Sequence, residues 1–119
     1  MKFEEVQNAP SLNQVREEIQ EIFDHYSLTA YNTYFDFGFM ESRGFVIKKD
    51  IPDIMEIAKE ACKIVYSKGG YKNPKMQEAW NKIFPNTNYI EAHRAVDDAI
   101  HEAEMLFEMY KRGCYKIEL

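Results

Sequence analysis

The sequence predicts an α/β fold that is rich in helix and has a reduced sheet. Five segments carry apolar residues at helical spacing, and only two short β-prone segments lie between them. A predicted helix separates the two β-prone segments, which is the kind of connection that joins parallel strands. Because two strands make a marginal sheet, the pattern also predicts that several strands of an ordinary α/β domain have no counterpart here.

The first predicted helix begins after Ser11 and runs for about four turns. Ser11 and Gln14 have the spacing of a capping box, in which each side chain accepts a hydrogen bond from the backbone of the other residue. Apolar residues then recur on one helical face, with charged residues between them. They are Leu12, Val15, Ile19, Ile22, Phe23 and Tyr26.

A short strand and a second helix are predicted next. Residues 27–31 are β-prone and end at Asn32, which is expected to cap a helix over residues 33–43. Gly44 is expected to end that helix. A phenylalanine at every second position would also suit a strand, so both interpretations stay open for this segment. These positions are Phe35, Phe37 and Phe39.

The second half of the chain begins with a short strand at residues 45–47 and continues as three helices. Pro52 is expected in the first turn of a helix that ends before Gly69 and Gly70. The apolar face of that helix is Ile54, Ile57, Ala58, Ala61 and Val65. A short helix follows Pro74, with one apolar side formed by Met76, Ala79, Trp80 and Ile83.

The last predicted helix covers residues 92–112, where Gly113 offers a left-handed stop. We expect its core-facing stripe to be Val96, Ala99, Ala103, Leu106, Phe107 and Tyr110.

Composition narrows the class of protein. A length of 119 residues supports one domain over residues 1–119, and 45% hydrophobic residues exclude intrinsic disorder. No apolar run approaches the ~20 residues of a membrane span, and the N-terminus lacks the order of a signal peptide. We therefore expect a soluble, cytoplasmic protein that does not associate with membranes.

Charge is unevenly distributed along the chain. The net charge of −5 argues against binding of nucleic acid through overall positive charge. Residues 43–82, however, carry 9 basic and 5 acidic groups, whereas residues 1–42 carry 2 basic and 8 acidic groups. This basic middle section is compatible with a phosphate-binding surface, and it is equally compatible with a solvated helix face.

Two segments carry residues suited to chemistry. Asp36 stands one turn into the helix that follows the first strand, and the carboxyl end of a strand is where α/β folds usually place their sites. His93 and Asp98 stand five residues apart at the start of the last helix. Each segment is weak evidence alone, since an aspartate in a first turn also stabilises the helix dipole.

Taken together, the two segments resemble motifs of a nuclease family. AYNTYFDFGFM resembles the second motif of DnaQ-like DEDDh 3′–5′ exonucleases (the family of the DNA polymerase III epsilon subunit), and AHRAVDDA resembles the third. NAPSLNQVREEI and DIPDIMEIAKEA resemble segments of the same family, although the second lacks the family's threonine. The resemblance covers about residues 6–113 and implies a ribonuclease H-like fold that hydrolyses phosphodiester bonds at a nucleic-acid 3′ end.

The resemblance also implies roles for individual residues. Asp36 and Asp98 correspond to metal-site acids, and His93 corresponds to the general base that takes the proton from the attacking water. The metal would be Mg²⁺ or Mn²⁺, since such hydrolysis typically uses two divalent ions held by carboxylates. Asp97 is expected to support the helix start, and His25 and His101 are expected to be surface residues.

Nucleic-acid contacts are expected at two places. Asn32 and Phe35 belong to the second motif and would contact the substrate near the acids. Lysines interleaved with tyrosines in the basic section would contact phosphates, with ordinary solvation of a loop as the alternative. These lysines are Lys68, Lys72 and Lys75.

The chain departs from the family pattern at its beginning. The first motif of the family is Asp-x-Glu on the first strand, and no aspartate here has a glutamate two positions later. The first three strands of the family fold have no counterpart either, so the fold is expected to be incomplete. The metal is therefore expected to bind weakly, or not at all, to this chain alone.

Two functions follow from this departure. In the first, the chain is part of an exonuclease that is incomplete or inactive by itself, and a homodimer or a partner chain covers the exposed strand at residues 27–31. In the second, the chain is a non-catalytic module, derived from an exonuclease, that binds nucleic acid or protein.

Overall fold

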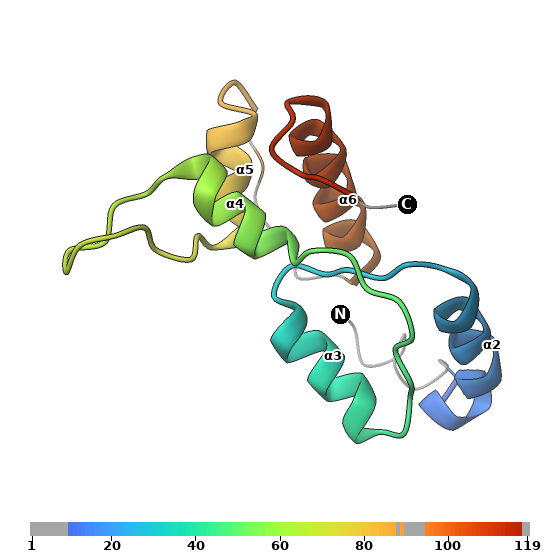
Figure 1. Ribbon diagram of the computed structural model, residues 1–119. Coiled ribbons are helices and arrows are strands. Elements are labelled where there is room, and N and C mark those ends of the chain that lie inside the picture. Colours follow the sequence, from blue (N-terminus) through green and yellow to red (C-terminus); the bar gives the residue numbers. More distant parts are fainter. Residues whose placement is uncertain (1–9, 88, 90–94, 118–119) are drawn as a thin grey trace.

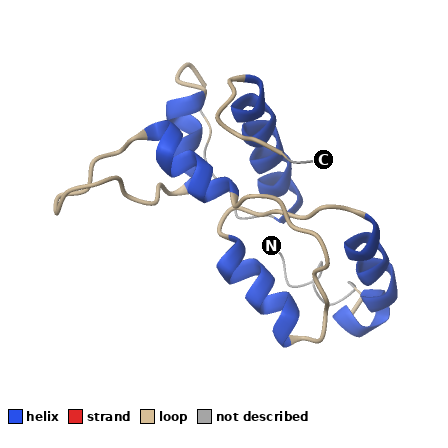
Figure 2. Cartoon of the chain, in the orientation of Figure 1, coloured by secondary structure: helices blue, strands red, loops and turns tan. Residues whose placement is uncertain are grey.

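The structure of the chain is a computed structural model that describes residues 10–87, 89 and 95–117. The helices of this part are α2 (Leu12–His25), α3 (Thr33–Ser42), α4 (Ile54–Cys62), α5 (Met76–Ile83) and α6 (Ala95–Lys111). Figures 1 and 2 show α4, α5 and α6 grouped together, with α2 and α3 beside them. No helix in the described ranges has both the length and the apolar character that crossing a bilayer requires.

Helix α2 confirms the predicted capping box and packs on the segment after α3. The side chains of Ser11 and Gln14 each accept a hydrogen bond from the other residue's backbone N–H. The ring centroids of Phe23 and Phe45 lie 5.7 Å apart, and Phe45 is buried. The Arg16 guanidinium lies 4.7 Å from the centre of the Phe45 ring, so this small cluster holds α2 in place.

The prediction of a strand at residues 45–47 is wrong, because a side chain from α2 takes up the hydrogen-bonding groups of this segment's backbone. The Gln20 side-chain amide donates to the Val46 carbonyl at 2.9 Å and accepts from the Val46 N–H at 2.9 Å. These are the two hydrogen bonds that a neighbouring strand would otherwise make. Helix α2 therefore takes the place of a strand partner at this position.

The expected pair of parallel strands is reduced to a single bridge. Leu28 pairs with Asp50 in parallel orientation, through Leu28 N–H to Lys49 C=O and Ile51 N–H to Leu28 C=O, both at 2.9 Å. The prediction of a strand over residues 27–31 is therefore wrong in extent, and pairing occurs later in the partner segment than expected. Within the described part of the chain, the sheet consists of isolated bridges only.

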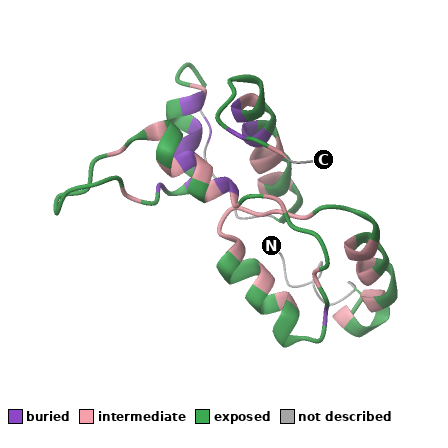
Figure 3. Ribbon diagram, viewed as in Figure 1, coloured by how far each residue is buried: buried purple, intermediate pink, exposed green. Residues whose placement is uncertain are grey.

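The hydrophobic core lies among α4, α5 and α6 (Figure 3). All four residues predicted for the apolar side of α5 are buried, and Trp80 is at their centre. The centroid of its ring lies 4.4 Å from the ring centroid of Phe84, 5.0 Å from that of Tyr89 and 4.9 Å from that of His101. The remaining core residues are Ile54, Ala58, Met105, Leu106, Met109 and Tyr115.

Helix α6 buries a different face from the one that its spacing predicts. Met105, Leu106 and Met109 are buried, whereas Val96 is 74% exposed and Phe107 is 63% exposed. The predicted core stripe is thus right at Leu106 and partly right at the half-buried Ala103, and it is wrong at the exposed positions Val96, Ala99, Phe107 and Tyr110. The reason is that α6 carries apolar residues on two faces, and periodicity alone does not decide which face meets the core.

One carboxylate joins the N-termini of α3 and α4. Asp53 caps α4 by accepting the Met55 N–H at 2.9 Å, so Pro52 lies just outside the helix. The same carboxylate accepts the Asn32 N–H at 2.9 Å and the Thr33 N–H at 3.0 Å. The expectation that the Asn32 side chain caps α3 is wrong, since Asp53 fills that role while Asn32 adopts a left-handed conformation with φ of 75°.

Replacing Asp53 should destabilise the protein strongly. Asp53→Ala removes one helix cap and leaves two further backbone N–H groups without their acceptor, which costs about 3 kcal/mol of unfolding free energy. Asp53→Asn keeps one acceptor oxygen and should cost roughly half as much. Urea denaturation measures both values, with the exposed neighbour Asp50→Ala as the matched control, expected within ~0.5 kcal/mol of wild type. Equal losses for Asp53→Ala and Asp50→Ala would contradict the double-cap role.

Candidate functional site

A cavity of about 300 Å³ lies where α3, α4 and α6 meet the segment that follows the Leu28 bridge. Its two acidic lining residues are Asp36 on α3 and Glu102 on α6. The other lining residues are small or apolar: Thr29, Ala30, Ile54, Ala99, Ala103 and Leu106. The cavity therefore combines two carboxylates with largely apolar walls.

Asp36 reaches the cavity because α3 begins immediately after the bridged segment. Its backbone N–H donates to the Asn32 carbonyl at 3.3 Å, which places the side chain in the first turn of the helix. Partial burial raises the pKa of the Asp36 carboxyl, and the negative charge of Asp53 raises it further. The folded protein thus holds this carboxylate in a position that disfavours its charge.

Glu102 is a site residue that sequence reasoning missed. It lies one helical turn after Asp98, and this i, i+4 spacing on α6 is the signal that could have found it. Its carboxylate accepts the Tyr31 N–H at 3.1 Å and so ties α6 to the segment that leads into α3. Glu102 therefore both lines the cavity and positions one of its walls.

Asp98 is half-buried near the beginning of α6. Its carboxylate accepts a hydrogen bond from the Tyr89 hydroxyl at 3.4 Å. Asp98 is not among the residues that line the cavity around Asp36. Its expected partner His93 lies outside the described residues, so the structure describes only one member of the predicted His93–Asp98 pair.

His101 and Asp97 have structural roles. The His101 ring stacks on Tyr89 with centroids 4.3 Å apart, and its Nδ1 lies 2.8 Å from the Asp97 carbonyl oxygen. The Asp97 carboxylate lies 3.6 Å from the same nitrogen. The expectation that His101 is a surface residue is wrong, because its ring belongs to the Trp80 cluster.

The predicted nucleic-acid residues fall into two separate groups. Asn32 and Phe35 lie at the start of α3 beside Asp36, and Phe35 is 67% exposed. Lys68, Lys72 and Lys75 lie in the connection between α4 and α5, which projects away from α6 (Figure 1). The first group therefore stands close to the cavity-lining Asp36 in sequence without lining the cavity itself, and the lysines lie on a different element.

The described residues do not form a complete metal site. In residues 10–87, 89 and 95–117, no group of three or more His, Cys, Asp or Glu side chains is arranged to hold an ion. Mg²⁺ requires six oxygen ligands in near-octahedral geometry, and the cavity offers two carboxylates. Further ligands are needed before a divalent ion fits here.

Replacing Asp36 should stabilise the protein near neutral pH. A carboxyl whose pKa is raised on folding costs stability where it is ionised, and this cost disappears below its ordinary pKa of 3.8. Asp36→Asn should therefore raise the urea midpoint near pH 7 and leave it unchanged near pH 3. The control Glu41→Gln, also exposed on α3, should show no such difference. A loss of stability at both pH values would assign Asp36 a structural role instead.

The comparisons with known proteins give one match. The family model described as Exonuclease (RNase T) matches residues 2–106 of the 119. No curated protein and no solved structure matches the chain. Exonucleases of this family generally use divalent metals and act on nucleic acid, and the match suggests a ribonuclease H-like fold. Because the match spans most of the sequence, the chain belongs to the exonuclease family.

Proposed function

We propose that this chain provides part of the active site of a DEDDh-type 3′–5′ exonuclease. The observation that carries the proposal is the cavity in which α3 presents Asp36 opposite residues of α6. Helix α6 also carries Asp98, one helical turn before the lining residue Glu102, so the acids of two predicted motifs stand on two of the helices that contribute to this cavity. The proposed reaction is hydrolysis of the phosphodiester bond at the 3′ end of a nucleic acid.

Each residue has a distinct role in this proposal. Asp36 and Asp98 would contribute oxygen ligands to Mg²⁺ or Mn²⁺ once further carboxylates complete the site, and the ion would supply the positive charge that activates water. His93 takes a proton from the attacking water, for which an imidazole with an ordinary pKa of about 6.5 is suited at neutral pH. Glu102 acts through the Tyr31 backbone and is a positioning residue.

The substrate would approach along the exposed face of α3. Phe35 is 67% exposed and Tyr34 is 92% exposed, and they stand one and two positions before Asp36 in the sequence. Bases stack on such rings with little preference for sequence. We assign Phe35 and Asn32 to the contact with the terminal nucleotides.

We propose that a second polypeptide, either another copy or a partner chain, covers this part of the molecule and supplies the missing carboxylates. The chain exposes 8856 Å², compared with about 6,700 Å² for a compact protein of 14.1 kDa. Its radius of gyration is 16.0 Å, compared with about 13.5 Å for a compact domain of this length. Large apolar side chains stand exposed on both helices beside the cavity: Tyr34, Phe35, Phe39, Val96, Ile100, Phe107 and Tyr110.

A non-catalytic module is the second candidate function, and the incomplete ligand set favours it. The two functions differ in their tolerance of Asp98→Asn. A module that only binds nucleic acid or protein would keep its function in this variant, whereas an exonuclease would lose hydrolysis.

Activity should depend on His93 and Asp98. With a 5′-labelled single-stranded oligonucleotide and Mg²⁺ or Mn²⁺, the wild-type chain should produce a ladder of 3′-shortened products once the second polypeptide is present. His93→Ala and Asp98→Asn should each reduce the rate at least ~100-fold, since a general base and a metal ligand act in the transition state. Gel electrophoresis of the products measures the rates.

The matched control for the histidine is His25→Ala, because His25 is exposed and its ring contacts the Glu21 carbonyl of its own helix. It should trim at the wild-type rate. Trimming by His93→Ala at the wild-type rate would refute the assigned base. Absence of trimming in every combination, with nucleic-acid or protein binding retained by Asp98→Asn, would establish the non-catalytic module.

Self-association tests which polypeptide covers the cavity. If it is another copy, sedimentation equilibrium at micromolar concentration should give a dimer of the 14.1 kDa chain. Ile100→Glu with Phe107→Glu should then return it to a monomer, because both changes place charge in the contact. Val65→Glu, at an exposed position on the α4–α5 connection, is the control and should remain dimeric. A clean wild-type monomer would exclude another copy as the covering chain.

A further inference from the structure

Residues 63–75 form a projecting arm between α4 and α5 (Figure 1), here called the basic arm. Val65 and Tyr71 pair as an antiparallel bridge, and the Tyr66 N–H donates to the Gly70 carbonyl at 2.7 Å. Gly69 and Gly70 have φ of 96° and 76°, which are values that glycine adopts without strain. The arm is thus a short hairpin with a defined turn.

The basic arm concentrates positive charge in an acidic protein. Residues 61–77 contain four lysines and no acidic residue, although the whole chain has a net charge of −5. Lys72 forms an ion pair with Glu78 at 3.0 Å, and the same carboxylate accepts the Lys75 N–H. These contacts lower the pKa of Glu78 and hold the end of the arm against α5. Lys63 and Lys68 make no ion pair within the described residues.

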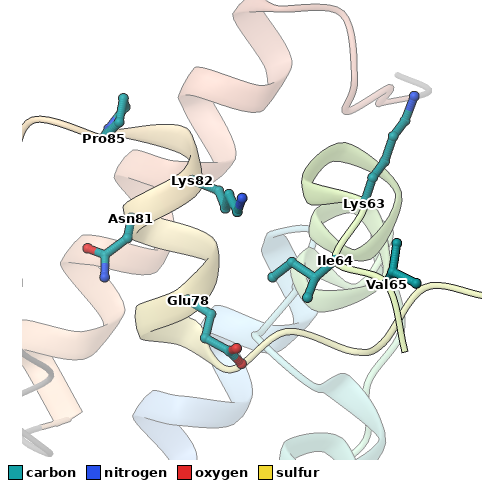
Figure 4. A pocket seen from close by; sticks show the side chains of 7 residues that line it. All are labelled: Lys63, Ile64, Val65, Glu78, Asn81, Lys82 and Pro85. Atoms are coloured by element: carbon teal, nitrogen blue, oxygen red, sulfur yellow. The ribbon is translucent and has the colours of Figure 1, made fainter. Parts of the chain in front are cut away.

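A groove of about 650 Å³ lies at the base of the basic arm. Lys63, Ile64 and Val65 line it from the arm, and α5 provides the opposite side, including Lys82 (Figure 4). Lys82 also makes no ion pair within the described part of the chain. Since Glu78 is already engaged by Lys72, Lys63 and Lys82 leave this groove with uncompensated positive charge.

Exposed aromatic side chains accompany the lysines of the arm. Tyr66 is 49% exposed and Tyr71 is 40% exposed, and neither belongs to the hydrophobic core. Lysines and exposed rings together are the combination that binds single strands, because phosphates meet the charges while unpaired bases stack on the rings. A duplex hides the faces of its bases and would use only the lysines.

We propose that the basic arm and the groove at its base bind single-stranded nucleic acid. Lys63, Lys68 and Lys82 contact phosphates, and Tyr66 and Tyr71 stack against bases. The inference rests on the proposed function in taking nucleic acid as the ligand, but the site is separate from the cavity at Asp36, since the arm projects away from α6 (Figure 1). It would hold the strand at a distance from the end that is hydrolysed.

Binding without hydrolysis tests this proposal. Fluorescence anisotropy in EDTA, with labelled oligothymidylate or oligouridylate of about 16 nucleotides, measures Kd over a range of salt concentrations. The triple change Lys63→Ala, Lys68→Ala and Lys82→Ala should weaken binding and reduce the slope of log K against log salt by about 2. Tyr66→Ala with Tyr71→Ala should weaken binding about tenfold or more with little change of slope.

Matched controls separate the arm from general charge. Lys49→Ala, Lys111→Ala and Lys116→Ala make the same charge change elsewhere, and Tyr26→Ala removes another exposed ring; both controls should bind as wild type. Wild-type binding by the arm variants would overturn the proposal. The proposal would also be overturned if duplex, polyglutamate or anionic lipid vesicles displaced the labelled oligonucleotide as well as unlabelled single strand does, since each of these competitors lacks accessible bases. Because EDTA prevents hydrolysis, loss of binding in this assay bears on the basic arm and not on the proposed exonuclease activity. Conversely, a chain that binds the oligonucleotide but does not trim it still supports binding at the arm.

Discussion

The arrangement of the molecule depends on the Asp53 carboxylate, which holds the first turns of α3 and α4 at the same time. Through Asn32 and Thr33 it fixes the start of the helix that carries Asp36, and through Met55 it fixes the helix that enters the core. The same charge contributes to the raised pKa of Asp36. One interaction thus sets both the geometry of the candidate site and part of its electrostatics.

The segment between α2 and α3 transmits this geometry to the rest of the fold. Tyr31 donates its backbone N–H to Glu102 on α6 and its hydroxyl to the Pro74 carbonyl before α5. The Tyr115 hydroxyl, after α6, donates to the Pro52 carbonyl. These bonds connect parts of the chain that are far apart in sequence. They therefore hold the helices together in this fold, as the hydrogen bonds between strands do in an α/β domain with a larger sheet.

Local signals predicted most of what is local. The capping box at Ser11, the buried face of α5 and the placement of Asp36 in a first turn all follow from residues within one or two turns. Long-range contacts account for the errors at residues 45–47 and at Asn32. The Gln20 side chain bonds to the backbone of Val46, 26 residues later, and so takes the place of a strand partner. Asp53 caps α3, which begins 20 residues before it. In the candidate site, the sequence motif singled out Asp36, which lines the cavity, whereas the contact of Glu102 with Tyr31 joins residues 71 positions apart and His93 lies outside the described residues.

The separation of acidic cavity and basic arm has an electrostatic consequence. Without bound cations, Asp36 and Glu102 repel a phosphodiester, so the cavity alone gives a nucleic acid little affinity. Positive charge at Lys63 and Lys68, which form no ion pair within the described residues, favours the same strand on a different part of the surface, where the groove-lining Glu78 is paired with Lys72. Affinity and chemistry are therefore assigned to different elements, and a change in one need not alter the other. Under the functions proposed above, this division would allow nucleic acid to bind at the arm whether or not a second polypeptide has completed the metal site.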